Sequence, residues 1–158
     1  MKMSTKGRYA VMAMIDIASQ PHEGPVSLAE IAGRQDISQE YLEQLFGKLR
    51  RARLVESARG PGGGYRLARP AGDIPMSEII LAVDEALRVT RCGGDAVDGC
   101  VKGLRCNAHD LWSSLGRQMM YFLESITLED VVAKRNLALT AAIKQATDRH
   151  MPVERQSA

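Results

Sequence analysis

A glycine-rich turn between two short apolar stretches constrains the fold of this chain more than any other feature. The turn covers residues 58–64, with the sequence Ala-Arg-Gly-Pro-Gly-Gly-Gly, and residues 54–57 and 65–67 flank it. Short apolar runs on either side of a glycine-containing turn are typical of a β-hairpin. We therefore expect two short strands joined by a glycine tip.

Three amphipathic helices are predicted before this hairpin. Apolar residues recur at helical spacing over residues 5–19, over residues 28–35 and after Ser38. Ser27 and Glu30 have the spacing of a capping box, and Ser38 is placed to cap the third helix. The predicted buried stripe of the third helix consists of Tyr41, Leu42, Leu45, Phe46 and Leu49.

The order helix, short helix, tight turn, helix and hairpin is that of a winged helix-turn-helix. The predicted fold class is therefore mainly α with a small β-hairpin wing, and residues 1–70 would form the DNA-binding domain. A linker over residues 70–74 and a further helix over residues 75–87 are expected to follow. The two remaining regions are residues 71–135, which hold the cluster-binding loop without periodicity over residues 88–109 and the dimerisation helices, and the tail of residues 136–158.

A long amphipathic helix is predicted from Asp110 onward. Its apolar stripe has spacings of 4, 4, 3 and 4 and consists of Leu111, Leu115, Met119, Phe122 and Ile126. Such a stripe is typical of a dimerisation helix, and it is equally typical of a helix that packs on its own core. The pattern leaves both interpretations open.

The charge distribution favours a nucleic-acid partner for the N-terminal half. Residues 1–70 contain 11 Lys and Arg against seven Asp and Glu, whereas residues 71–158 contain ten against 12. The glycine run is not a P-loop, because no Lys-Ser or Lys-Thr pair follows it. In a helix-turn-helix the start of the second helix reads base edges. The candidate base contacts are Ser38, Gln39, Glu40, Glu43 and Gln44.

Basic side chains follow these positions and are candidate backbone contacts. Lys48 and Arg51 lie late in the same helix, and they are candidates to neutralise phosphates. Arg59 lies at the hairpin tip, where an arginine can enter a narrow minor groove. Arg66 is a further candidate for the flanking phosphates.

Three cysteines and one histidine have the spacing C-x7-C-x5-C-x2-H. These residues are Cys92, Cys100, Cys106 and His109. Clustered thiols in a reducing cytosol serve metal or redox chemistry more often than disulfides. An iron–sulfur cluster and a zinc ion fit the spacing equally well. His109 could also begin the next helix without any role as a ligand.

Four segments resemble the IscR-type family of winged-helix iron–sulfur regulators over about residues 1–130. They are residues 5–11, residues 38–46, residues 59–65 and the spaced cysteine and histidine set. The resemblance implies a homodimer that binds a double-stranded DNA operator and carries a 2Fe–2S cluster on Cys92, Cys100, Cys106 and His109. It also implies repression of cluster-assembly genes, with the assembly machinery as cluster donor.

The resemblance further implies that Glu43 selects between operator classes, while Gln44 contacts a base and Arg59 the minor groove. Glu40 departs from the family pattern, in which a small polar residue is expected, and this puts the preferred operator in doubt. The alternatives are a nitric-oxide or iron-responsive relative with a 4Fe–4S cluster, and a zinc-stabilised DNA-binding protein. An enzyme with cysteine nucleophiles is disfavoured, because no motif places a base near the thiols.

No apolar run approaches the length of about 20 residues that spans a bilayer. The first apolar stretch, residues 10–15, is closed at once by Asp16 and makes a poor signal peptide. We therefore expect a cytoplasmic protein without a membrane partner.

Overall fold

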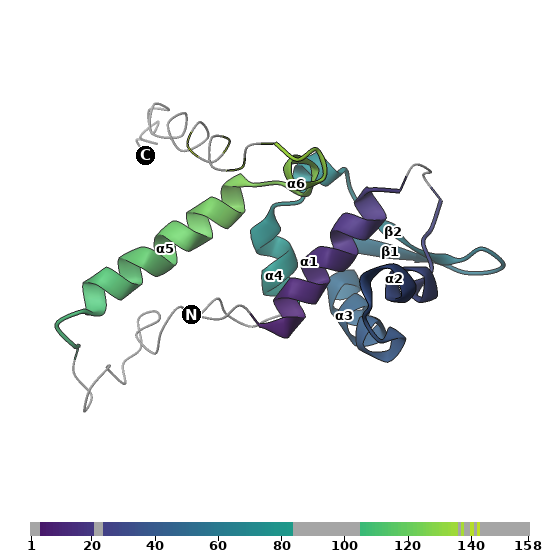
Figure 1. Ribbon diagram of the computed structural model, residues 1–158, viewed down its shortest axis with the longest axis horizontal. Coiled ribbons are helices and arrows are strands. Elements are labelled where there is room, and N and C mark those ends of the chain that lie inside the picture. Colours follow the sequence, from purple (N-terminus) through teal and green to yellow (C-terminus); the bar gives the residue numbers. More distant parts are fainter. Residues whose placement is uncertain are drawn as a thin grey trace, which may run out of the picture.

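The computed structural model describes residues 4–20, 24–83 and 105–135, together with residues 137, 140 and 142. Cys92, Cys100, the end of the helix predicted over residues 75–87 and nearly all of the predicted tail lie outside the described residues. The described elements, in chain order, are α1 Thr5–Ala18, α2 Leu28–Gln35, α3 Gln39–Arg51, β1 Val55–Ala58, β2 Gly64–Leu67, the 3-10 turn η1 Ala71–Asp73, α4 Met76–Val83, α5 His109–Ser125 and α6 Leu128–Val132 (Figure 1). The predicted class, mainly α with a hairpin wing, is confirmed.

Each of the helices α1, α2, α3 and α6 begins at a side-chain cap. Ser27 and Glu30 form the predicted capping box, and the Ser38 hydroxyl accepts from the backbone N–H of Tyr41 at 3.3 Å. Ser4 and Thr127 cap α1 and α6 in the same way. A cap satisfies N–H groups that the first helical turn leaves without an internal partner. These local bonds fix where each helix starts.

One hydrophobic core joins the helix-turn-helix to the segments that follow residue 70. The predicted stripe of α3 is confirmed at Leu42, Leu45, Phe46 and Leu49, which are buried, whereas Tyr41 is half-buried and packs edge-on against Tyr9 of α1. The same core includes buried residues from every helix except α5, among them Met14, Ile31, Ile79 and Leu128. The helix-turn-helix therefore has no separate core of its own.

The segment predicted as a linker over residues 70–74 is a packed part of this core. It contains the turn η1, and Ile74 is fully buried. The N–H of Leu128 donates to the carbonyl of Ile74 at 2.8 Å, and the N–H of Met76 donates to that of Ile126 at 2.9 Å. The linker prediction is wrong because the hydrogen-bond partners of this segment, Ile126 and Leu128, are about 50 residues away in the sequence. A local sequence pattern does not reveal such partners.

The hairpin pairs Val55 with Leu67 at its base and Ala58 with Gly64 near its tip. Both strands differ by one residue from the predicted ranges. A short bridge also ties the hairpin to the chain before α2, because Val26 and Tyr65 exchange two backbone hydrogen bonds of 2.8 Å. A Cβ on Gly64 would lie 2.3 Å from the carbonyl oxygen of Val26. Gly64 therefore allows this close crossing.

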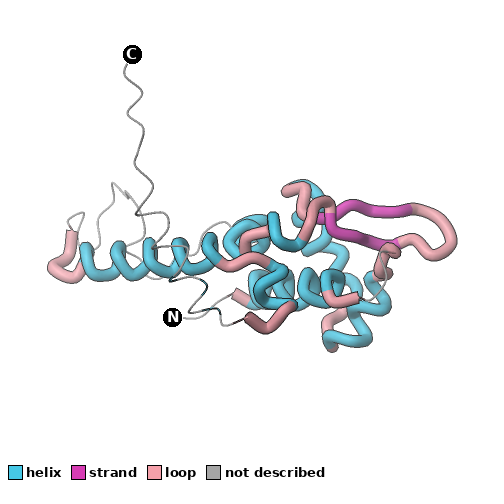
Figure 2. The backbone as a smooth tube through the Cα atoms, turned by 90° about the horizontal axis from the view of Figure 1, so that it is seen from above, coloured by secondary structure: helices cyan, strands magenta, loops and turns pink. Residues whose placement is uncertain are grey.

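Helix α5 leads away from the packed helices, on the side opposite the hairpin (Figures 1 and 2). None of its 17 residues is buried. It meets the rest of the chain at its C-terminal end, where Ile126 is buried and Leu123 packs against the core. In the predicted apolar stripe, Leu111 and Phe122 are exposed, whereas Leu115 and Met119 are half-buried.

Replacing Gly64 with alanine is expected to lower the free energy of unfolding by about 2 kcal/mol, because the new methyl group overlaps the backbone of Val26. Gly62→Ala is the matched control. It meets no atom within 4 Å and carries only the strain of its positive φ of 75°, about 1 kcal/mol. Urea unfolding measures the free energy of unfolding of both variants. If Gly64→Ala loses no more stability than Gly62→Ala, the close approach of Gly64 to the backbone of Val26 is contradicted.

Candidate nucleic-acid interface

The exposed face of α3 carries the predicted base contacts. Gln39, Glu40, Glu43 and Gln44 are exposed, and Arg51 is exposed two turns further along. Residues three or four apart lie on one face of a helix, so Glu40, Gln44 and Arg51 form one line along α3. The buried stripe holds the opposite face against α1 and α4. The helix is thus presented outward along its whole length.

Two of the predicted contacts are joined to each other. The side-chain amide of Gln39 donates to the carboxylate of Glu43 at 3.2 Å, one turn further along the helix. One oxygen of Glu43 therefore already accepts a hydrogen bond. Such a carboxylate can accept from the N4 amino group of cytosine.

Lys48 lies at the flank of α3 and is half-buried. Its ammonium donates to the carbonyl oxygen of Val83 in α4 at 3.0 Å. Sequence reasoning missed this bond because the partner is 35 residues away. In the free protein the charge is thus directed toward α4, and the predicted phosphate contact of Lys48 stays a prediction.

The wing presents Arg59 beside the hairpin tip. The tip turns through Gly60 and Gly62, whose φ values of 103° and 75° suit glycine. Arg59 is exposed, and it makes no hydrogen bond or ion pair with another residue in the part of the chain that the structure describes. Arg66, by contrast, pairs with Glu56 across the two strands at 3.2 Å, and both side chains are more than half exposed.

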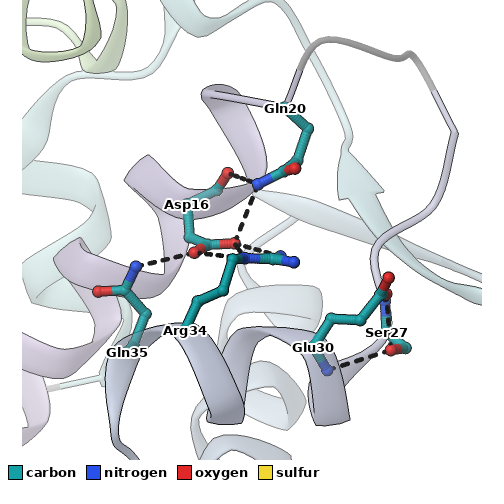
Figure 3. A network of polar contacts seen from close by, with 6 residues as sticks. All are labelled: Asp16, Gln20, Ser27, Glu30, Arg34 and Gln35. Carbon is teal, nitrogen blue, oxygen red and sulfur yellow. Dashed lines mark hydrogen bonds and ion pairs between the residues drawn. The ribbon is translucent and has the colours of Figure 1, made fainter.

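A buried carboxylate fixes the helix-turn-helix against α1 (Figure 3). The side chain of Asp16 is only 3% exposed and accepts from both Nε and Nη2 of Arg34 at 2.6–3.1 Å. Gln35 donates to it at 2.8 Å, and Gln20 donates at 3.3 Å. Burial alone would raise the pKa of Asp16, but the hydrogen bonds from Arg34 and Gln35 outweigh it and hold this pKa below its ordinary value.

Sequence reasoning used Asp16 only as the end of an apolar stretch. The signal that could have found it is its position between Ile15 and Ile17 in α1, where an acid on the buried side of a helix needs a partner. Its partners Arg34 and Gln35 lie at the end of α2. The network therefore holds α2, and through it the turn into α3, at a fixed place on α1.

Two of the four predicted metal ligands lie within the described residues, at the start of α5. The backbone N–H of His109 donates to the carbonyl of Cys106 at 3.0 Å, and both residues are half-buried. This single turn places a thiol and an imidazole close together in the chain, with His109 as the first residue of the helix. Among the described residues there is no group of three potential ligands, and Cys92 and Cys100 lie outside them.

A profile of the Rrf2 family, described as "Iron-dependent Transcriptional regulator", matches residues 3–134. The chain belongs to the Rrf2 family. A relative named HTH-type transcriptional regulator IscR, from Xenorhabdus nematophila, is 51% identical over 149 residues, which are 94% of this chain and 89% of the relative. The predicted resemblance to IscR-type regulators is thereby confirmed.

Solved structures of other Rrf2 proteins share the fold. The structure of CymR from B. subtilis, titled the global cysteine regulator, has a TM-score of 0.73 at 34% identity and covers 86% of this chain and 99% of its own. IscR of T. potens has a TM-score of 0.67 at 37% identity and covers 96% and 93% of the two chains. This Rrf2 protein is a DNA-binding transcription regulator. No helix in the described ranges is long and apolar enough to cross a membrane.

Asp16→Asn is expected to lower the free energy of unfolding at pH 7 by about 2 kcal/mol, because neutral hydrogen bonds replace the charge-assisted ones that the buried carboxylate accepts from Arg34 and Gln35. A depressed pKa in the folded state means that the charged carboxylate stabilises the protein above about pH 4. This stabilisation is lost as the pH falls through the folded-state pKa. The difference in free energy of unfolding between the wild type and Asp16→Asn should therefore be smaller at acid pH.

Urea unfolding at pH 7 and at pH 3 tests this expectation. Glu56→Gln is the control, because it breaks an exposed ion pair and should cost less than about 1 kcal/mol. If the difference in free energy of unfolding is the same at both pH values, the charge of Asp16 is not what stabilises the α1–α2 contact.

Proposed function

We propose that this regulator senses iron–sulfur status through a 2Fe–2S cluster on Cys92, Cys100, Cys106 and His109, and that it acts mainly as a repressor of cluster-biogenesis genes. The observation that carries the proposal is the turn from Cys106 to His109, which places two of the four candidate ligands at the start of the exposed helix α5. The family's description as iron-dependent supports iron over zinc. A 4Fe–4S cluster is the alternative cluster type.

The donor set fits a cluster. Thiolates are the usual ligands of iron–sulfur centres, and histidine replaces cysteine in some 2Fe–2S sites. A bound cluster would supply a centre that iron supply and oxidants alter. Cys106 and His109 would hold it at one end of α5, and Arg105, which is exposed beside Cys106, would offset part of the thiolate charge.

The cluster prediction is tested by anaerobic purification with iron, sulfide, zinc and visible-absorption analysis. We expect about two irons and two sulfides per chain, and loss of both in Cys106→Ala. His109→Ala should leave a more labile cluster, whereas Ser114→Ala, at an exposed serine of α5, should leave it unchanged. About four irons would favour the 4Fe–4S alternative, and a colourless zinc protein would remove the sensing function while leaving DNA binding intact.

We propose a homodimer that forms through α5. Large apolar side chains are exposed along this helix: Leu111 is 63% exposed, Tyr121 53%, Phe122 38% and Trp112 37%. Exposed apolar surface gathered on one element marks an interaction site. A second copy is the fitting occupant, because a dimer places two recognition helices on operator half-sites about 34 Å apart.

Phe122→Glu is expected to convert the dimer to a monomer at micromolar concentration, because a charge would be buried in the apolar seam. Sedimentation velocity measures the change, and operator affinity should fall with it. Arg117→Glu, an exposed charge change on the same helix, should leave the dimer intact. A Phe122→Glu protein that remains dimeric would place the interface elsewhere.

The DNA contacts proposed are Ser38, Gln39, Glu40, Glu43 and Gln44 toward bases and Lys48, Arg51, Arg59 and Arg66 toward the backbone and minor groove. The outward face of α3 and the exposed arginine beside the wing tip support them. The proposed site of action is the cytoplasm, where a cluster-assembly machinery would be the donor of the cluster.

A further inference from the structure

Gly47 lies in the middle of α3, the helix that carries the predicted base contacts. Its backbone is ordinary right-handed helix, since it is not among the described residues with positive φ. A Cβ added to it would meet no atom within 4 Å. Glycine destabilises a helix interior more than any residue except proline. Among the described residues, neither the backbone nor the packing therefore explains a glycine at this position.

The position of Gly47 supplies an explanation. It follows Gln44 by three residues and precedes Arg51 by four, so it lies on the same outward line of α3. The residues that read base edges come from the first turns of such a helix. Gly47 is eight residues beyond Gln39, or about 12 Å along the axis, where the helix passes the wall of the groove rather than its floor.

The neighbouring side chains leave this place open. Lys48 is directed toward α4 by its bond to Val83, and Arg51 is exposed one turn further along the helix. Along this line the bare backbone at Gly47 follows Gln44, and Arg51, a cation suited to phosphate, follows one turn later. Glycine allows a ligand to approach the backbone closely.

We propose that Gly47 is a contact point for the sugar–phosphate backbone of the operator, where the absence of a side chain lets α3 lie deeper in the major groove. The proposal rests on the DNA-binding function and deepens it. The contact would depend on the missing side chain and not on a charge, so it would neutralise no phosphate. Base readout by Glu43 and Gln44 would depend on the depth that Gly47 permits.

Gly47→Ala tests the proposal because its effects on folding and binding are opposite. Alanine should raise the melting temperature by about 3 °C and weaken DNA binding by about tenfold. Gly33→Ala is the matched control, since Gly33 is also a helical glycine, in α2, whose Cβ would meet no atom within 4 Å. It should raise the melting temperature without changing the affinity.

The probe is a duplex selected by the wild-type chain from a random-sequence pool, and fluorescence anisotropy measures its affinity across a salt series. Gly47→Ala should keep the wild-type salt slope because it removes no charge. Arg51→Gln should reduce that slope by about one unit for each phosphate that the arginine neutralises in the wild type. A larger residue, as in Gly47→Leu, should weaken binding further than alanine does.

Equal affinity of wild type and Gly47→Ala would overturn the proposal. So would an equal loss in Gly33→Ala, because helix stiffening would then be the cause. If the wild-type chain selected no duplex at all, the DNA-binding function itself would fail, which is a different result from failure at Gly47 alone.

Discussion

The buried carboxylate of Asp16 sets the place of the helix-turn-helix on the rest of the molecule. It joins α1 to the end of α2 through Arg34 and Gln35 (Figure 3), and α2 leads into α3 through Asp36, whose φ of 53° is left-handed. Only the carboxylate of this ion pair is buried, and a buried carboxylate needs hydrogen-bond donors in fixed directions. The apolar core stabilises the packed helices, but the hydrophobic effect is non-directional and does not by itself orient one helix on another. The hydrogen bonds of Asp16 orient α2 on α1, and in this way they help to hold the exposed face of α3 outward.

Local sequence patterns predict much of this architecture. The caps at Ser27, Ser38 and Thr127 bond to residues three positions away, so the sequence alone places them. The stripe from Leu42 to Leu49 repeats at helical spacing, and it separates the inner from the outer face of α3. The exposed candidates for base contact follow directly from that separation, which is why their exposure could be predicted.

Long-range partners were beyond such patterns. Ile74 was assigned to a linker, although it is buried against the segment around Leu128. The bond from Lys48 to Val83 and the pairing of Asp16 with Arg34 join residues 35 and 18 positions apart. Each needs the folded chain to bring its partners together. For the ligand set, the spacing of cysteines and histidine suggested a metal centre, and only Cys106 and His109 lie where the structure describes their surroundings.

The bridge between Val26 and Tyr65 affects how the wing can vary. Two strands of four residues are marginal by themselves, but this bridge anchors Tyr65, one pair from the tip end of the strands, to the chain that enters α2. The strands are therefore held in place as far as Tyr65, and the turn of residues 59–63 extends beyond this anchor. Residues added to or removed from the tip would change how far Arg59 reaches, while α3 kept its place. The reach of the proposed wing contact can thus vary independently of the proposed contacts of α3 among proteins with this fold.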